Sequence, residues 1–220
     1  MKLLKRMTGL GGLICATLLA ASCDLVTSTN QSVFILFDAS GTYAKSAPAA
    51  ARSASLLVSK LQPGDWIGAG QISSCSFSEK EILLQEQLPE TPSRADAAKR
   101  EIFGKLKTYS EQIKPTKFTD IRGALAQAAF ELRQRPEASR SIIVFSDMIE
   151  DLAKDCNTSG VSLDLSGITV VASNVIKSSP ADPDKYFAML DDWEKVVTDA
   201  GGKWVLVASP DQLTTLVAQR

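Results

Sequence analysis

Short apolar runs alternate along the chain with longer stretches in which apolar residues recur at helical spacing. Runs that contain β-branched and aromatic residues predict strands at 32–37, 66–73, 141–147, 168–173 and 203–208. The stretches between them predict helices at 47–61, 94–109, 120–135 and 186–200, with a last helix from 209–210 onward. Most of these strands are apolar throughout, which is typical of strands buried on both faces. The pattern therefore predicts an α/β protein with a doubly wound, Rossmann-like and mostly parallel sheet, covered by helices on both faces.

Turn and capping signals add detail to this pattern. Residues 80–88 are expected to pair with 66–73 as a hairpin, which gives the sheet one antiparallel edge strand. Ser93 and Thr119 each precede a predicted helix and are residue types that favour the N-cap position. The chain shows no internal repeat, so we expect one domain over residues 32–220.

Composition removes several classes of function. The 220 residues carry a formal net charge of −1 at pH 7 and include no histidine. Without imidazole, the chain cannot build a Ser-His-Asp triad or a histidine-ligated metal site. There is no block of lysine and arginine, so nothing in the charge pattern supports binding to nucleic acid.

Residues 1–23 have the features of a bacterial secretory signal peptide. A cluster of cations precedes an apolar stretch that is too short to be a convincing membrane span. The small residues that lead to Cys23 resemble a lipobox, which implies that a lipid is attached to Cys23 as the first residue of the mature protein. The alternative is plain cleavage after Ser22, which leaves Cys23 unmodified.

The residues after Cys23 indicate where the mature protein resides. Asp24 directly after the cysteine resembles the signal that retains Gram-negative lipoproteins in the inner membrane. Residues 24–31 are polar and short, as expected for a tether between an anchor and a domain. We therefore expect an exported, periplasmic protein that is held at the inner membrane by Cys23.

Polar side chains follow the predicted strands at the points where the strands end. Asp38, Ser40 and Thr42 come after the first strand, Asp147 ends the strand at 141–147, and Thr119 lies in the loop before a helix. Right-handed crossovers place all such loops at the carboxyl edge of a parallel sheet, where ligands bind. Two carboxylates and three hydroxyls form a set of hard oxygen ligands, which suits Mg²⁺, Mn²⁺ or Ca²⁺.

Two further cysteines follow predicted strands. Cys75 and Cys156 come after the second strand and after the strand at 141–147, so both should lie near the same edge of the sheet. In an oxidising compartment an even pair favours a disulfide, and two free thiols are the alternative. We expect the two cysteines to bond and to connect loops at the rim of the candidate site.

Three of these stretches together resemble the metal-ion-dependent adhesion site of von Willebrand factor A domains. The stretches are "DASGT" at 38–42, "TDIRGAL" at 119–125 and "VFSDMIED" at 144–151. The segment "LQPGDWIGAGQIS" at 61–73 also resembles the entry of that family into its second strand. The likeness extends over nearly all of residues 32–220.

The resemblance implies a role for each of the five residues. Ser40, Thr42 and Thr119 would bind the metal directly, whereas Asp38 and Asp147 would act mainly through bound water. Thr42 departs from the serine that is usual in the family. The metal would be Mg²⁺, with Mn²⁺ or Ca²⁺ as alternatives. An open position in its coordination shell would accept a Glu or Asp side chain from a protein partner. The predicted function is non-enzymatic, metal-dependent protein binding in adhesion or assembly.

Two other functions remain open at this point. "FDASGT" also resembles the first motif of haloacid dehalogenase phosphatases, in which Asp38 would be the nucleophile and Mg²⁺ the cofactor. In that comparison Ser40 stands where the phosphatases have a second aspartate for proton transfer. A metal-free domain that serves only as a scaffold is the other possibility.

Overall fold

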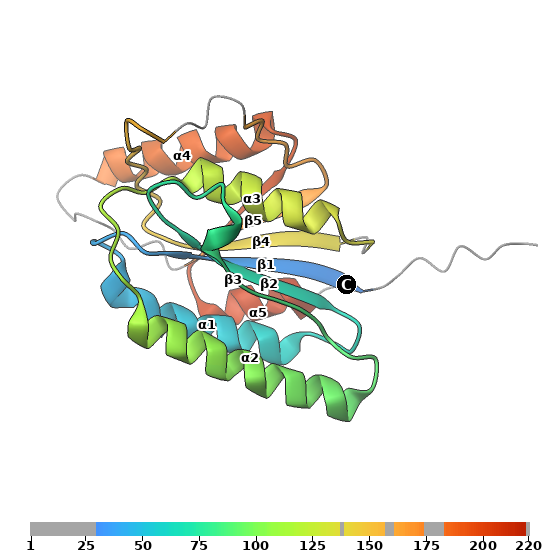
Figure 1. The fold of residues 1–220 in the computed structure, drawn as a ribbon. Helices are drawn as coiled ribbons and strands as arrows, with labels where there is room; N and C mark the ends of the chain where they lie inside the picture. Colours follow the sequence, from blue (N-terminus) through green and yellow to red (C-terminus); the bar gives the residue numbers. More distant parts are fainter. Residues whose placement is uncertain (1–29, 137–138, 157–160, 174–182, 219–220) are drawn as a thin grey trace, which may run out of the picture.

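The computed structural model describes residues 30–136, 139–156, 161–173 and 183–218, which form a layered α/β structure (Figure 1). The predicted signal peptide, the candidate lipidation site Cys23 and the tether up to residue 29 lie outside the described residues. Among the helices that the structure describes, none has both the length and the apolar character needed to cross a membrane.

One six-stranded sheet forms the middle layer. Its strands are β1 (Gln31–Asp38), β2 (Trp66–Ile72), β3 (Ile82–Gln87), β4 (Ser139–Phe145), β5 (Ile168–Ser173) and β6 (Lys203–Val207). They lie in the order β3-β2-β1-β4-β5-β6, and every pair is parallel except β2 with β3. The doubly wound sheet with one antiparallel edge strand is confirmed.

Helices cover both faces of the sheet (Figure 1). The helices are α1 (Ala47–Lys60), α2 (Pro92–Gln112), α3 (Ile121–Arg133), α4 (Pro183–Asp199) and α5 (Pro210–Ala218), with short 3₁₀ turns η1 (Ala44–Ser46) and η2 (Glu79–Glu81). The α1, α2 and α5 helices lie below the sheet in Figure 1, and α3 and α4 lie above it.

The central strand β1 is buried along its whole length and contributes to two cores. Val33, Ile35 and Phe37 pack in the core on the side of α1 and α2, whereas Phe34 and Leu36 pack in the core on the side of α3 and α4. Successive side chains of a strand point to opposite faces, so a strand between two helical layers must be apolar at every position. This accounts for the uninterrupted apolar run in the sequence.

Three local predictions were wrong. Helix α2 begins at Pro92 after an N-cap at Thr91, so Ser93 lies inside the first turn instead of capping it. Helix α3 is capped by the side chain of Asp120, not by Thr119. Strand β4 ends at Phe145, so Asp147 lies two residues beyond the strand.

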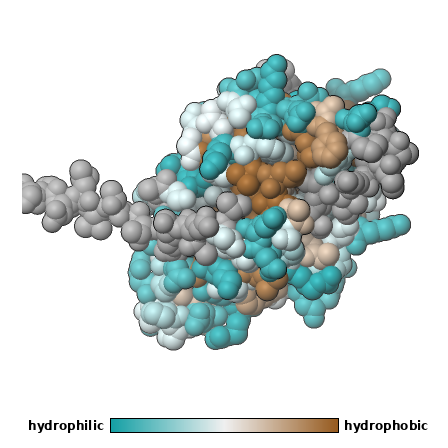
Figure 2. All heavy atoms as spheres, turned by 180° about the vertical axis from the view of Figure 1, so that it is seen from behind, coloured by the Kyte–Doolittle hydropathy of each residue, from teal (hydrophilic) through white to brown (hydrophobic). Residues whose placement is uncertain are grey.

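The two edges of the sheet differ in their surroundings. Strand β3 lies toward the viewer in Figure 1, between α3 and α2. Figure 2 shows the opposite side of the molecule, where apolar atoms gather near the centre of the view. At the β6 edge, Leu206 is 48% exposed and Trp204 and Val205 are half-buried.

The turn before β2 depends on the buried carboxylate of Asp65. Its two oxygens accept hydrogen bonds from the backbone N–H groups of Gln31, at 3.1 Å, and Gln62, at 2.7 Å. Gly64 has a φ of 82°, which suits glycine in a tight turn. We expect Asp65→Ala to lower the free energy of unfolding by about 2 kcal/mol, because it leaves the N–H groups of Gln31 and Gln62 without these acceptors. Urea unfolding measures this, with the exposed Asp96→Ala as the control that should change little.

Candidate metal centre

The loop after β1 places two hydroxyls beside the carboxylate that ends the strand. Asp38 is fully buried, and its Oδ1 accepts the backbone N–H of Ser40 at 2.7 Å. The Ser40 carbonyl then accepts the N–H groups of Tyr43 and Ala44, at 3.1 and 2.8 Å, which starts η1. This tight turn holds the side chains of Ser40 and Thr42 on one side of the loop.

Three side-chain oxygens converge at the carboxyl edge of the sheet. The hydroxyl oxygens of Ser40 and Thr42 lie 3.1 Å apart, and the Thr42 hydroxyl donates to Oδ2 of Asp147 at 2.9 Å. The other oxygen of Asp147 accepts the N–H of Ile149 at 3.0 Å, which fixes the carboxylate. Residues that are 105 positions apart in the chain, Thr42 and Asp147, are thus in direct contact.

A residue that the sequence analysis did not single out, Ser146, connects the loop after β4 to the carboxylate of Asp38. Its hydroxyl donates to Oδ2 of Asp38 at 2.6 Å and accepts the backbone N–H of Met148 at 2.9 Å. Ser146 lies directly before Asp147, so it joins the loop after β4 to the end of β1. Both oxygens of Asp38 are therefore engaged by protein donors.

The loop that carries Thr119 lies between these two loops. The N–H of Thr116 donates to the carbonyl of Ala39 at 2.7 Å. Thr119 exchanges two backbone hydrogen bonds with Asp151, at 2.7 and 3.0 Å. Thr119 is 4% exposed, and its hydroxyl has no hydrogen-bond partner within the described part of the chain. The structure therefore brings Ser40, Thr42 and Asp147 into contact and places Thr119 in the adjoining loop.

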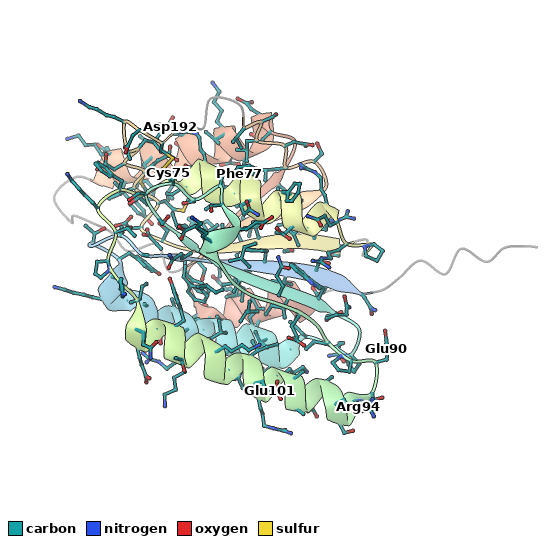
Figure 3. All side chains as sticks on the ribbon, viewed as in Figure 1. Cys75, Phe77, Glu90, Arg94, Glu101 and Asp192 are labelled. Atoms are coloured by element: carbon teal, nitrogen blue, oxygen red, sulfur yellow. A yellow bond between two sulfur atoms is a disulfide. The ribbon has the colours of Figure 1, made fainter. Side chains whose placement is uncertain are left out.

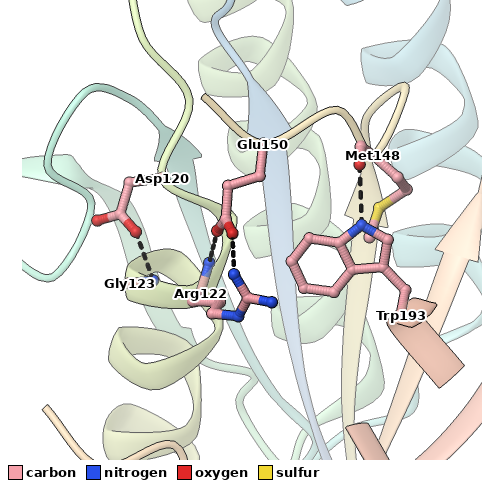
Figure 4. Close-up of polar contacts among 6 residues, drawn as sticks. All are labelled: Asp120, Arg122, Gly123, Met148, Glu150 and Trp193. Carbon is pink, nitrogen blue, oxygen red and sulfur yellow. Dashed lines mark hydrogen bonds and ion pairs between the residues drawn. The ribbon is translucent and has the colours of Figure 1, made fainter. Parts of the chain in front are cut away.

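Asp120 holds the start of α3 against the loop that follows β2. Its Oδ1 accepts the N–H of Gly123 and its Oδ2 accepts the N–H of Ser76, each at 2.8 Å (Figure 4 shows the first). A Cβ atom at Gly123 would lie 2.1 Å from Oδ2 of Asp120, which explains the glycine in "TDIRGAL". Thr119 is thus positioned by its neighbour.

The loop after β4 is held from its outer side (Figure 4). Glu150 accepts the backbone N–H of Arg122 at 3.0 Å and pairs with its guanidinium. The indole N–H of Trp193 donates to the carbonyl of Met148 at 2.8 Å. Met148 has a φ of 62°, so the chain turns sharply directly after Asp147. These contacts orient the Asp147 carboxylate toward Thr42.

The predicted disulfide is present. Cys75 and Cys156 are bonded, with their Cα atoms 5.5 Å apart. Figure 3 labels Cys75 near the carboxyl end of the parallel strands, in the loop that also carries Phe77. The bond connects the loop between β2 and η2 to the loop after β4. It therefore links two loops at the rim of the candidate site.

The site is rich in negative charge. Burial raises the pKa of the Asp38 carboxyl, and the neighbouring charge of Asp147 adds to the rise, while hydrogen bonds from Ser146 and Ser40 oppose it. Within the described residues, neither Asp38 nor Asp147 forms an ion pair with lysine or arginine. A bound cation would therefore reduce the electrostatic repulsion between these two carboxylates.

The donor set fits a hard divalent cation. The described residues contain no group of three or more His, Cys, Asp or Glu side chains placed to hold a metal. The oxygens that converge here come from two hydroxyls and one carboxylate, with Asp38 and Thr119 beside them. Mg²⁺, Mn²⁺ and Ca²⁺ accept such oxygen ligands together with water.

Comparisons with known proteins identify the fold. No protein family matches the chain in a sequence scan, and no curated protein matches it. Among solved structures, a von Willebrand factor type A protein from Catenulispora acidiphila has 14% identity and a TM-score of 0.55, and the match covers 86% of this chain and 41% of that one. A conserved hypothetical protein, BatB from Bacteroides thetaiotaomicron, has 16% identity and a TM-score of 0.50, with 86% and 96% covered.

A third similar structure is the open conformation of the pilus adhesin SpaC from Lactobacillus rhamnosus GG. It has 12% identity and a TM-score of 0.53, with 86% of this chain and 29% of the adhesin covered. The chain thus spans less than half of two of these proteins and nearly all of BatB. At these identities the likeness establishes the fold, which is that of a von Willebrand factor A domain, as the sequence motifs predicted.

Proposed function

We propose that this protein is a von Willebrand factor A domain protein that binds a protein partner through a divalent cation. The observation that carries the proposal is the contact of Ser40, Thr42 and Asp147, whose oxygens lie within 3.1 Å of their neighbours at the carboxyl edge of the sheet. A cation bound there would supply the positive charge that attracts a carboxylate of the partner.

The proposed site combines neutral hydroxyl ligands with charged carboxylates. Ser40 and Thr42 offer neutral hydroxyl oxygens, and Thr119 adds a third from the adjoining loop. Asp38 and Asp147 supply the negative charge and, through water, complete the shell. Because the direct ligands are neutral, the cation keeps more of its charge for an incoming Glu or Asp side chain. Mg²⁺ is the proposed ion, with Mn²⁺ and Ca²⁺ as alternatives.

A phosphatase that uses Asp38 as nucleophile is disfavoured by the geometry. Oδ1 of Asp38 accepts a backbone N–H at 2.7 Å, and Oδ2 accepts the Ser146 hydroxyl at 2.6 Å. A nucleophilic carboxylate needs an oxygen directed at the substrate, and the residue is 0% exposed. We therefore propose a non-enzymatic role in adhesion or assembly.

The proposed setting is the periplasm. A lipid on Cys23 would anchor the domain to the inner membrane and leave the metal edge free to meet a partner. The disulfide between Cys75 and Cys156 is compatible with an oxidising compartment. Mass spectrometry of the mature N-terminus tests the anchor, and an unmodified Cys23 would contradict it.

Titration with Mg²⁺, Mn²⁺ and Ca²⁺ tests the metal site. We expect at least one ion to raise the melting temperature, because an ion that binds the folded state alone stabilises it by about 2.7 kcal/mol at 100 times its Kd. For a domain of this size that corresponds to roughly 5–10 °C. Differential scanning fluorimetry measures the shift, on protein that has been treated with a chelator and then dialysed to remove it.

The same protein preparation tests the two alternative functions, a phosphatase and a metal-free scaffold. Release of phosphate from p-nitrophenyl phosphate in the presence of Mg²⁺ would support the phosphatase and contradict our proposal. A melting temperature that none of the three ions changes would support a metal-free scaffold. We expect the ion-dependent shift without phosphate release.

A further inference from the structure

In the part of the chain that the structure describes, no other strand covers the outer edge of β3. Strand β3 pairs with β2 on one side and ends the sheet on the other. Every second residue of an edge strand directs its N–H and C=O groups away from the sheet, where a further strand can bind them. Within the described residues, no backbone hydrogen bond reaches residues 84–87 from outside the β2–β3 pair.

Strand β3 pairs regularly with β2 from Leu84 to Gln87. The register with β2 shifts next to Leu83, and from Leu84 to Gln87 the pairing runs in order from Ala69 to Trp66. The sequence Ile-Leu-Leu-Gln-Glu-Gln contains no proline and no lysine, which are residues that commonly protect an edge from further pairing. Four regular residues thus remain available for an added strand.

A hollow of about 660 Å³ lies beside β3 on the side of α2. Leu83, Leu84 and Ile113 form apolar walls, and Lys105 and Lys114 also line it. The hydroxyl of the half-buried Tyr109 donates to Oε1 of Gln71 at 3.2 Å, so this polar group already has a partner. The hollow fits an apolar side chain.

A second hollow, of about 600 Å³, lies on the side of α3 and has a different chemistry. Glu131 is 6% exposed, and its carboxylate accepts hydrogen bonds from the side-chain amides of Gln85, at 2.8 Å, and Gln127, at 3.0 Å. Glu79 also lines this hollow, and no lysine or arginine does among the described residues. The hollow therefore has an acidic group that lacks a cation.

We propose that the β3 edge binds an extended segment of a partner protein by strand addition. Alternate side chains of an added strand point to opposite faces of the sheet. An apolar residue would enter the hollow beside α2, and the next residue, a lysine or arginine, would reach Glu131 in the hollow beside α3. Backbone hydrogen bonds supply affinity, and the two hollows select the sequence.

The β3 strand of a second copy does not fit the same edge. The β3 strand offers no basic residue of its own, so pairing two β3 strands would leave Glu131 without a cation in both copies. Glu86 is the only acidic residue of β3, and an added β3 strand would bring a second copy of it to this edge. The charge pattern therefore favours a basic, apolar segment of a partner protein over a second β3 strand. This site is independent of the metal centre.

The test uses a labelled synthetic peptide, Thr-Val-Arg-Val-Arg-Val-Thr, and the mature protein in the presence of EDTA. We expect fluorescence anisotropy to detect binding, and peptides with glutamate for arginine, or with N-methyl groups on alternate backbone nitrogens, to bind at least about 10-fold more weakly. Equal binding of the arginine and glutamate peptides, or no effect of N-methylation, would overturn the proposal.

Variants of the protein locate the site. Glu131→Gln keeps the size of the side chain but removes its charge, and it should weaken binding of the arginine peptide by about 10-fold. Its melting temperature checks that the variant is folded. Glu86→Gln is the matched control on β3, because Glu86 faces Lys105 of α2 at 4.0 Å, and it should bind as the unaltered protein does. If Glu86→Gln weakens binding as much as Glu131→Gln, the assignment of the basic side chain is wrong. Because EDTA is present throughout, these outcomes do not depend on the metal site.

Discussion

Replacement of Asp147 with asparagine is expected to remove most of the ion-dependent stabilisation while the fold stays intact. Asparagine keeps an oxygen that can accept the N–H of Ile149 and a group that can hydrogen-bond to Thr42. It loses the negative charge that would hold the cation through water. Loss of such a supporting group typically weakens metal binding by about 10- to 100-fold.

The size of the expected effect follows from mass action. At an ion concentration of 100 times Kd, stabilisation is about 2.7 kcal/mol, and a 100-fold loss of affinity reduces it to about 0.4 kcal/mol. Without the ion, the melting temperature of Asp147→Asn should equal or exceed that of the unaltered protein, since the variant relieves repulsion with Asp38. Scanning fluorimetry with and without ion measures both quantities in one experiment.

Asp151→Asn is the matched control. Asp151 lies on the same loop, and its backbone groups, which the substitution leaves in place, pair with Thr119. Its ion response should therefore remain. The stretch "SDMIED" at 146–151 also resembles the acidic magnesium-binding motif of haloacid dehalogenase phosphatases, and such an enzyme would lose its ion response in both variants. An equal loss in the two variants would contradict the ligand set proposed here.

The sheet and the meeting of its loops could be predicted from the sequence. The strands buried on both faces are apolar without interruption, so β1 and β4 are visible as runs. Right-handed crossovers then bring the carboxyl ends of both strands to one edge of the sheet. The sequence therefore predicts that Thr42 and Asp147 lie close together, and the structure shows them in contact.

The supporting residues depend on details that a pattern does not contain. Ser146 reaches Asp38 because Phe37 and Phe145 are paired in register, which places the residues after them side by side. In the sequence, Ser146 is only one more hydroxyl near the end of a strand. The pair Thr119 and Asp120 offers two possible caps one residue apart. The choice of Asp120 depends on Ser76, a distant residue whose N–H it also accepts.

The largest change in the free energy of unfolding is expected for removal of the disulfide. Cys75 and Cys156 are separated by 81 positions, so the bond closes a long loop in the unfolded chain. In the chain-entropy account, its removal lowers the free energy of unfolding by about 4.5 kcal/mol. We expect the Cys75→Ser, Cys156→Ser double variant to unfold at a clearly lower urea concentration than the oxidised protein.

Removal of the disulfide is also expected to weaken ion binding. The bond links the loop that carries Ser76 to the loop that carries Asp151, and these two loops contact Asp120 and Thr119 respectively. Removal of the link leaves Thr119 less firmly placed, so ion affinity should fall together with stability. Reductant should lower the unfolding midpoint of the unaltered protein to that of the double variant and leave the variant unchanged. An equal midpoint for the oxidised protein and the variant would show that the bond contributes nothing to folding, and the rim loops would then be held by their hydrogen bonds alone.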